Sequence, residues 1–194
     1  MLFLFDVFKE SLALTERDCT LISSHFQFQQ RDKREAILLP GSHCDYLILV
    51  EAGCLRSFVF DANDREFNLM FAYDRQWMTD MQSFSAGEAS KLTIEAMEKS
   101  RIWIIEREDL TALMAQVPVL RHFFSDLSVD TICALQERIA NSVTLTAKEH
   151  YRSMTQSQAE LLRRVPQYHI ANYLGITPES LSRIRKELIL ETTK

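Results

Sequence analysis

The sequence is short of the residues that mark several classes of protein. Its 194 residues include four cysteines, which form no C-x-x-C pair and no spacing typical of a metal site. No apolar stretch approaches the roughly 18 residues of a membrane-spanning helix, so we expect no membrane partner. The start, MLFLFDVFKE, lacks a basic beginning and contains Asp6, which argues against a signal peptide. We therefore expect a cytoplasmic protein with reduced thiols.

Patterns that carry catalysis are also missing. The five histidines are scattered, and there is no Ser-His-Asp or Cys-His set, metal motif or phosphate-binding loop. The acidic residues Glu106, Glu108 and Asp109 begin a predicted helix, where they suit its dipole. Cys44 and Cys54 could face each other across a hairpin and form a redox switch, although cysteines in strands are more often small core side chains. We expect no enzyme activity, no metal and no cofactor.

Charge is divided unequally along the chain. Residues 1–147 contain 14 Lys and Arg against 22 Asp and Glu, whereas residues 148–194 contain 8 against 5. The net charge of −5 disfavours a generally basic nucleic-acid binder. A basic C-terminal module on an acidic body is instead typical of a DNA-binding regulator with a separate sensing domain.

Short β-rich runs follow an N-terminal helix that we predict over residues 6–23. The runs are separated by turn signals and read HFQFQQ, EAILL, DYLILVE, CLRSFVF, EFNLMFAY, KLTIEAM and RIWIIE. Strands at intervals of about ten residues indicate a sandwich or barrel. Three of the four glycines fall at turns between these runs, which supports the same interpretation.

The helical period returns after Ile105. A short helix over 107–117 precedes a long one predicted over 119–145. Apolar residues of the long helix recur mostly every three or four positions, at Phe123, Phe124, Leu127, Ile132, Leu135, Ile139 and Val143. This stripe could bury against the β-rich part, or against a second copy of the helix as in a coiled coil. Thr146 and Glu149 form a capping box, so we expect a boundary near residue 145 and one or two helices over 146–164.

Residues 165–188 predict two short helices joined at Gly175. The first covers 167–174, and the second runs from Pro178 to about residue 190, with Thr177 as its N-cap. The apolar face consists of Ile170, Leu174, Ile176, Leu181, Ile184 and Leu188, and Ala171 is small where the helices cross. An ordinary helical hairpin is the alternative. The coincidence of cap, glycine and outward polar residues favours a DNA-reading helix-turn-helix.

Polar side chains of the second predicted helix have a chemistry suited to reading bases. Arg183 can donate two hydrogen bonds to guanine, Glu179 can accept one from cytosine, and Ser182 suits either base type. Glu179 and Arg183 are four residues apart, so they can also pair with each other. The predicted DNA-binding residues are Tyr168, His169, Thr177, Pro178, Glu179, Ser180, Ser182, Arg183 and Lys186.

The order of these elements resembles that of the Crp/Fnr superfamily of bacterial transcription regulators. The run T-P-E-S-L-S-R from Thr177 to Arg183 is similar to the family's E-x-x-S-R, and C-D-Y-L-I-L-V-E-A-G-C-L-R from Cys44 to Arg56 is similar to its early β-hairpin. The resemblance implies an α+β fold with an N-terminal antiparallel, cyclic-nucleotide-binding-like β-roll, a long dimerisation helix and a C-terminal helix-turn-helix domain. The implied domains are residues 1–116, 117–145 and 146–194. The implied partners are double-stranded DNA, a second copy of the chain as a homodimer, and RNA polymerase.

The predicted effector pocket departs from the family's pattern. Members that bind cyclic AMP carry Gly-Glu, a short helix and Arg-Ser; the arginine neutralises the cyclic phosphate, and N–H groups of the helix assist. These pairs align here with Thr79-Asp80 and Ser90-Lys91, so the main cation is lost, and Lys91 should point outward. The expected pocket residues are Thr79, Asp80, Met81, Ser90 and Lys91. The N-terminal cysteine cluster that the family's iron–sulfur branch uses is missing. Only residues 189–194 follow the predicted reading helix, where a β-hairpin wing usually comes.

Together these observations predict a sequence-specific transcription regulator of the Crp/Fnr type that does not respond to cyclic AMP. Its input would be an unidentified small-molecule effector. The alternative is a cyclic-nucleotide-fold receptor for small molecules whose terminal helices form a protein-interaction module without DNA binding. The basic C-terminal segment favours the first interpretation.

Overall fold

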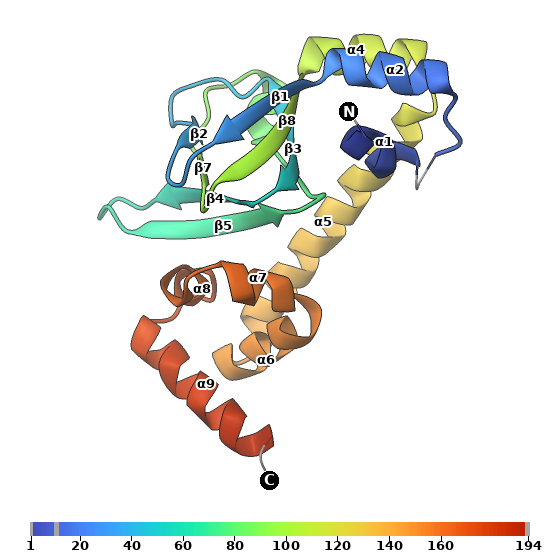
Figure 1. The fold of residues 1–194 in the computed structure, drawn as a ribbon. Coiled ribbons are helices and arrows are strands. Elements are labelled where there is room, and N and C mark those ends of the chain that lie inside the picture. Colours follow the sequence, from blue (N-terminus) through green and yellow to red (C-terminus); the bar gives the residue numbers. More distant parts are fainter. Residues whose placement is uncertain (1, 10–11, 193–194) are drawn as a thin grey trace. The chain divides into compact units, whose positions relative to one another are not determined.

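The computed structural model describes residues 2–9 and 12–192 (Figure 1). The helices are α1 Leu2–Lys9, α2 Glu16–His25, α3 Met81–Ala86, α4 Arg107–Gln116, α5 Leu120–Thr144, α6 Ala147–Ser157, α7 Ala159–Arg164, α8 Gln167–Tyr173 and α9 Pro178–Thr192. The strands are β1 Gln27–Arg31, β2 Ala36–Leu38, β3 Tyr46–Ala52, β4 Cys54–Phe60, β5 Glu66–Tyr73, β6 Trp77–Met78, β7 Thr93–Ala96 and β8 Ser100–Glu106. In the described residues, no helix has both the length and the apolar character needed to cross a membrane.

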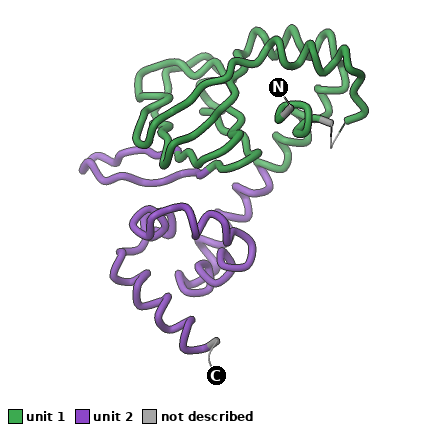
Figure 2. The backbone as a smooth tube through the Cα atoms, viewed as in Figure 1, with its two compact units in different colours: residues 1–56, 72–131 green, residues 57–71, 132–194 purple. Residues whose placement is uncertain are grey.

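Spatial contacts group the chain into two compact units, which Figure 2 shows in different colours. The first unit comprises residues 1–56 and 72–131, and the second comprises residues 57–71 and 132–194. The second unit therefore combines most of the β4–β5 hairpin with the helical C-terminal part of the chain. The three-part domain division predicted from the sequence stays a prediction.

Two four-stranded sheets form the β-roll. Their strand orders are β1-β8-β3-β6 and β2-β7-β4-β5. The pairs β1–β8, β2–β7, β3–β6 and β3–β8 are antiparallel. Each predicted β-rich run contains one of these strands, and the antiparallel β-roll is confirmed. Strand β6 was not predicted, because its two residues are too few to show a period; Trp77 pairs with Leu49 of β3.

The N-terminal prediction of one helix over 6–23 is wrong, because the structure has α1 and α2 there instead. Thr15 begins α2 as an N-cap with extended backbone: its hydroxyl oxygen accepts a hydrogen bond from the Asp18 N–H at 3.2 Å. The Asp18 carboxylate accepts from the Thr15 N–H at 3.0 Å, which completes a capping box. A residue in this conformation cannot continue a helix through the segment before it.

The apolar core of the first unit is rich in aromatic rings. Phe8 of α1 is 1 % exposed. Its ring centroid lies 5.0 Å from that of Phe123 and 6.1 Å from that of Trp77. The start of α5 therefore buries part of its apolar stripe within this unit. Further along α5, exposed apolar side chains remain, namely Val129, Ile132, Leu135, Ile139 and Val143.

The turn between β3 and β4 can accept only glycine without strain. Gly53 has φ +113°, and an added Cβ would lie 2.7 Å from the backbone Cα of Ser100. We expect Gly53→Ala to lower the free energy of unfolding by more than about 2 kcal/mol in urea titrations. Gly41→Ala is the matched control, because Gly41 has φ +86° with open space around it. It should lower that free energy by only about 1–2 kcal/mol; equal losses would contradict the clash at Ser100.

Candidate functional site

The predicted helix-turn-helix is present as α8, a turn at Gly175, and α9. Gly175 has φ +70°, the left-handed conformation that the turn needs. Ala171 of α8 and Leu181 of α9 are both 0 % exposed, as expected of residues on the facing sides of two packed helices. The Ile176 N–H donates to the Ala171 carbonyl oxygen at 3.0 Å and fixes the path of the turn.

The start of α9 is capped as its sequence predicts. The Thr177 hydroxyl oxygen accepts a hydrogen bond from the Ser180 N–H at 3.2 Å, and Pro178 occupies the first helical position. Glu179 lies in this first turn, and a hydrogen bond from its own backbone N–H, followed by one from Thr177, lowers its pKa. Its carboxylate therefore stays ionised at the helix start, where the dipole favours negative charge.

The base-reading side chains predicted on α9 are mostly open to solvent. Glu179, Ser182, Arg183 and Lys186 are exposed, as are Thr177 and Pro178. Ser180 was expected to point outward from α9, but it is half-buried. Its hydroxyl oxygen accepts from the Thr177 hydroxyl at 3.2 Å and from an Arg183 N–H at 3.3 Å. Ser180 thus supports the cap and binds the Arg183 side chain.

The two predicted DNA contacts on α8 have different surroundings. Tyr168 is 56 % exposed and available to a partner. His169 is half-buried: its Nδ1 lies 3.5 Å from Glu66 Oε1 and 3.5 Å from Asn68 Nδ2. The sequence analysis did not predict that residues of β5 would contact α8. The one available signal was a polar Asn68 within the otherwise apolar run F-N-L-M-F.

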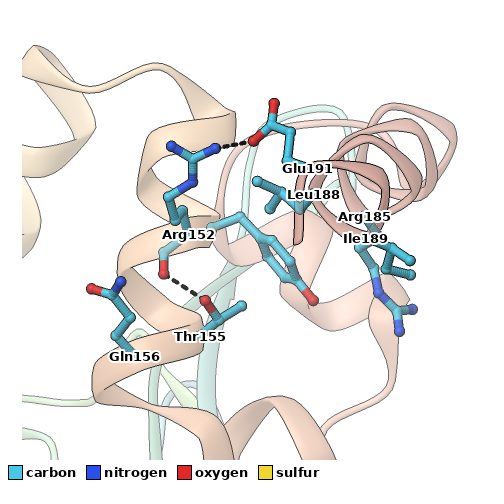
Figure 3. Close-up of a pocket in the computed structure, with 8 residues that line it drawn as sticks. Arg152, Thr155, Gln156, Arg185, Leu188, Ile189 and Glu191 are labelled. Carbon is cyan, nitrogen blue, oxygen red and sulfur yellow. Dashed lines mark hydrogen bonds and ion pairs between the residues drawn. The ribbon is translucent and has the colours of Figure 1, made fainter. Parts of the chain in front are cut away.

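A cleft of about 750 Å³ lies between α6 and α9 (Figure 3). At its edge Arg152 forms an ion pair with Glu191. Lys148 Nζ lies 2.7 Å from Glu187 Oε2 and 2.8 Å from Glu191 Oε1. Hydrogen bonds to Glu187 and Glu191 raise the pKa of Lys148. These pairs join the C-terminal half of α9 to α6, and salt should weaken them because they are exposed.

The predicted effector pocket satisfies its polar groups internally. Asp80 and Ser90 are 6 % and 4 % exposed, and the Ser90 hydroxyl donates to Asp80 Oδ2 at 2.6 Å. Asp80 is also the N-cap of α3: its Oδ1 accepts from the N–H groups of Gln82 and Ser83 at 3.0 and 3.2 Å. The donors that would face a cyclic phosphate in this segment are therefore bound to a carboxylate of the chain. These residues do not fit a cyclic phosphate, since the cation is absent and an anion is already present.

The remaining pocket residues point to the same conclusion. The Thr79 hydroxyl donates to the Tyr46 carbonyl oxygen at 2.8 Å, so it is used within the fold. Met81 is 52 % exposed and Lys91 is exposed. Cys44 and Cys54 are both buried. Over residues 2–9 and 12–192, no three His, Cys, Asp or Glu side chains form a group that could hold a metal ion.

The structure has a β-roll with a short capped helix after β6, as in a cyclic-nucleotide-binding-like domain, and this part is followed along the chain by a long helix and a terminal helix-turn-helix. Residues 28–117 match the family model of the cyclic nucleotide-binding domain. The fold over most of the chain is similar to that of a structure assigned to the Crp/Fnr family and to those of FixK2 and CooA. A search of curated protein sequences finds no match.

Three solved structures illustrate this likeness. A protein assigned to the Crp/Fnr regulators from Eubacterium rectale is 22 % identical, with a TM-score of 0.70, over 96 % of this chain and 88 % of its own. FixK2 from Bradyrhizobium japonicum is 18 % identical, with a TM-score of 0.74, over 86 % of each chain. A CooA variant from Carboxydothermus hydrogenoformans is 17 % identical, with a TM-score of 0.74, over 97 % of this chain and 84 % of its own.

Proposed function

We propose that the protein is a sequence-specific, DNA-binding transcription regulator that acts as a homodimer without cyclic AMP. The observation that carries this proposal is the capped helix α9, which presents Glu179, Ser182 and Arg183 to solvent on its first turns. These are the positions from which a recognition helix reaches base edges in the major groove. Nothing in this function requires catalysis.

A homodimer is supported by the unpaired apolar stripe of α5. Its members Ile132, Leu135 and Ile139 are 55 %, 41 % and 65 % exposed in the single chain. Pairing two such stripes would remove this surface from water and would give one reading helix to each half of an operator. The half-sites would then lie about one helical turn, roughly 34 Å, apart.

The proposal is tested by measuring DNA binding as a function of salt. A DNA-reading protein should select a palindromic site from random duplexes. The logarithm of its association constant should fall linearly with the logarithm of salt concentration, by about 0.9 per phosphate contacted. Light scattering at tens of micromolar should give the mass of a dimer. Absence of salt-dependent DNA binding would favour the alternative, a small-molecule receptor with an interaction module.

Cyclic AMP should show no useful binding to the wild-type protein. Ser90 occupies the position of the arginine that neutralises the cyclic phosphate in cyclic-AMP-binding members of the family. Asp80 Oδ1 already accepts hydrogen bonds from the N–H groups at the start of α3. Bringing a phosphate next to that carboxylate would add repulsion to the loss of its hydration. Isothermal titration calorimetry is therefore expected to show no heat of binding at micromolar nucleotide.

Ser90→Arg provides the sharper form of this experiment. The new guanidinium would lie beside Asp80 and pair with it, so the substitution alone should not create tight binding. Low-micromolar affinity in either the wild type or this variant would overturn the account of the pocket. The variant's thermal unfolding, followed in parallel, verifies that the domain is folded when it is titrated.

A further inference from the structure

Strand β5 is the last strand of its sheet, and side chains from helices bind several of its backbone groups. The Asn68 N–H donates to Asn172 Oδ1 of α8 at 2.6 Å, and Asn172 Nδ2 donates to the Glu66 carbonyl oxygen. One side-chain amide thus pairs with residues i and i+2 of the strand, as a neighbouring strand would. Asn68 itself is 2 % exposed, and its Nδ2 donates to the His169 carbonyl oxygen at 3.2 Å.

Arg138 of α5 completes the same set of contacts. Its guanidinium donates to the Asn68 carbonyl oxygen at 3.1 Å and to that of Leu69. Its Cζ lies 4.0 Å from the centroid of the Tyr173 ring, a cation–π distance. Phe71 of β5 packs on that ring at 5.4 Å between centroids. We call Glu66, Asn68, Arg138 and Asn172 the edge latch; all four belong to the second compact unit.

The edge latch connects α5 to α8 without using the chain between them. Helix α5 ends at Thr144, and a new capping box at Thr146 begins α6, so the backbone is not continuously helical there. Rotation at this break would change the direction of the reading helix relative to α5. The edge latch restrains it, because β5 contacts both Arg138 before the break and Asn172 after it.

We propose that the edge latch is a positioning element that sets the separation of the two reading helices in the dimer with no effector bound. This inference rests on the proposed function, since it assumes that α5 pairs and that α9 reads DNA. Asn172 acts through α8 and Arg138 through α5, and neither is among the residues proposed to contact bases. Their loss should therefore leave the binding of one half-site nearly unchanged while it reduces simultaneous binding of two.

The test measures the operator affinity of the wild type and of Asn172→Ala. The first operator is the one obtained by binding-site selection. The others have their half-sites one or two base pairs closer together or further apart. The wild type should prefer one spacing. The variant should lose about tenfold in affinity at that spacing, lose at most about twofold on an isolated half-site, and discriminate less between spacings. Arg138→Lys, which keeps the charge but not the fork of donors, should show the same pattern.

Asn63→Ala is the matched control, because Asn63 is an exposed residue in the turn of the same hairpin. It should behave as the wild type. Equal losses of Asn172→Ala on one and two half-sites would show a merely structural role, and an unchanged spacing preference would also overturn the proposal. Hydrogen exchange reports the latch independently of DNA: the Asn68 amide should exchange slowly in the wild type and faster in the variant. Slow Asn68 exchange in a wild type that binds no DNA would refute the proposed function rather than the latch contacts.

Discussion

Replacing Arg183 with alanine is expected to weaken binding to the selected operator by about 1–3 kcal/mol and to remove the preference at one guanine position. The side chain is exposed on α9, and its guanidinium donates to the neutral Ser180 hydroxyl at 3.3 Å. Guanine O6 and N7 would offer it two acceptors in the geometry of its fork. Loss of that bidentate contact removes both affinity and sequence information.

Binding-site selection at fixed salt measures this effect, with two other α9 variants for comparison. Lys186→Ala should weaken all sequences alike and reduce the salt slope by about one, as loss of a phosphate contact does. Glu179→Ala should relax preference at a neighbouring position with a smaller loss of affinity, because a carboxylate near phosphates is itself repelled. If Arg183→Ala selects the same sequence logo as the wild type, the proposed reading surface is wrong.

Ile139→Glu is expected to produce a monomer and to reduce affinity for the two-half-site operator by at least about 100-fold. Ile139 is 65 % exposed in the single chain, so the change should leave the fold of the chain intact. In a dimer the same position would be buried in the seam, where two carboxylates would face each other without partners. Light scattering at tens of micromolar measures the first effect, and fluorescence anisotropy with labelled operator measures the second.

Ala134→Glu is the control for this substitution. Ala134 is exposed and follows Ile132 by two residues, so it lies about 200° around the helix from Ile132. This variant adds the same charge to the same helix and should remain a dimer with nearly wild-type affinity. A dimeric Ile139→Glu protein would place the interface elsewhere.

Local chemistry made the ends of the chain's elements predictable. Thr146 and Thr177 accept the hydrogen bonds expected of N-caps, and Gly175 has the positive φ expected of the turn. Each of these signals involves residues within about four positions of one another, so one sequence suffices to detect it. The β-rich runs were predictable for the same reason, since alternation is a short-range property.

Features that depend on distant residues could not be predicted in this way. The Asn68–Asn172 hydrogen bond joins residues 104 positions apart, and neither asparagine belongs to a periodic pattern that indicates its partner. The sequence placed Asp80 and Ser90 in one segment, but it could not show that they bind each other. The sequence also showed that the family's arginine is missing from that segment, but it could not show which contacts the segment makes instead.

A sensory pocket closed by its own side chains would move control from the concentration of a signal to the abundance of the regulator. With Ser90 bound to Asp80, and Asp80 bound to the start of α3, the domain has its hydrogen-bond partners without a ligand. Operator occupancy would then follow the copy number of the protein, and for a homodimer it would rise with the square of that number when copies are few. Synthesis and degradation of the chain would set the timing of the response.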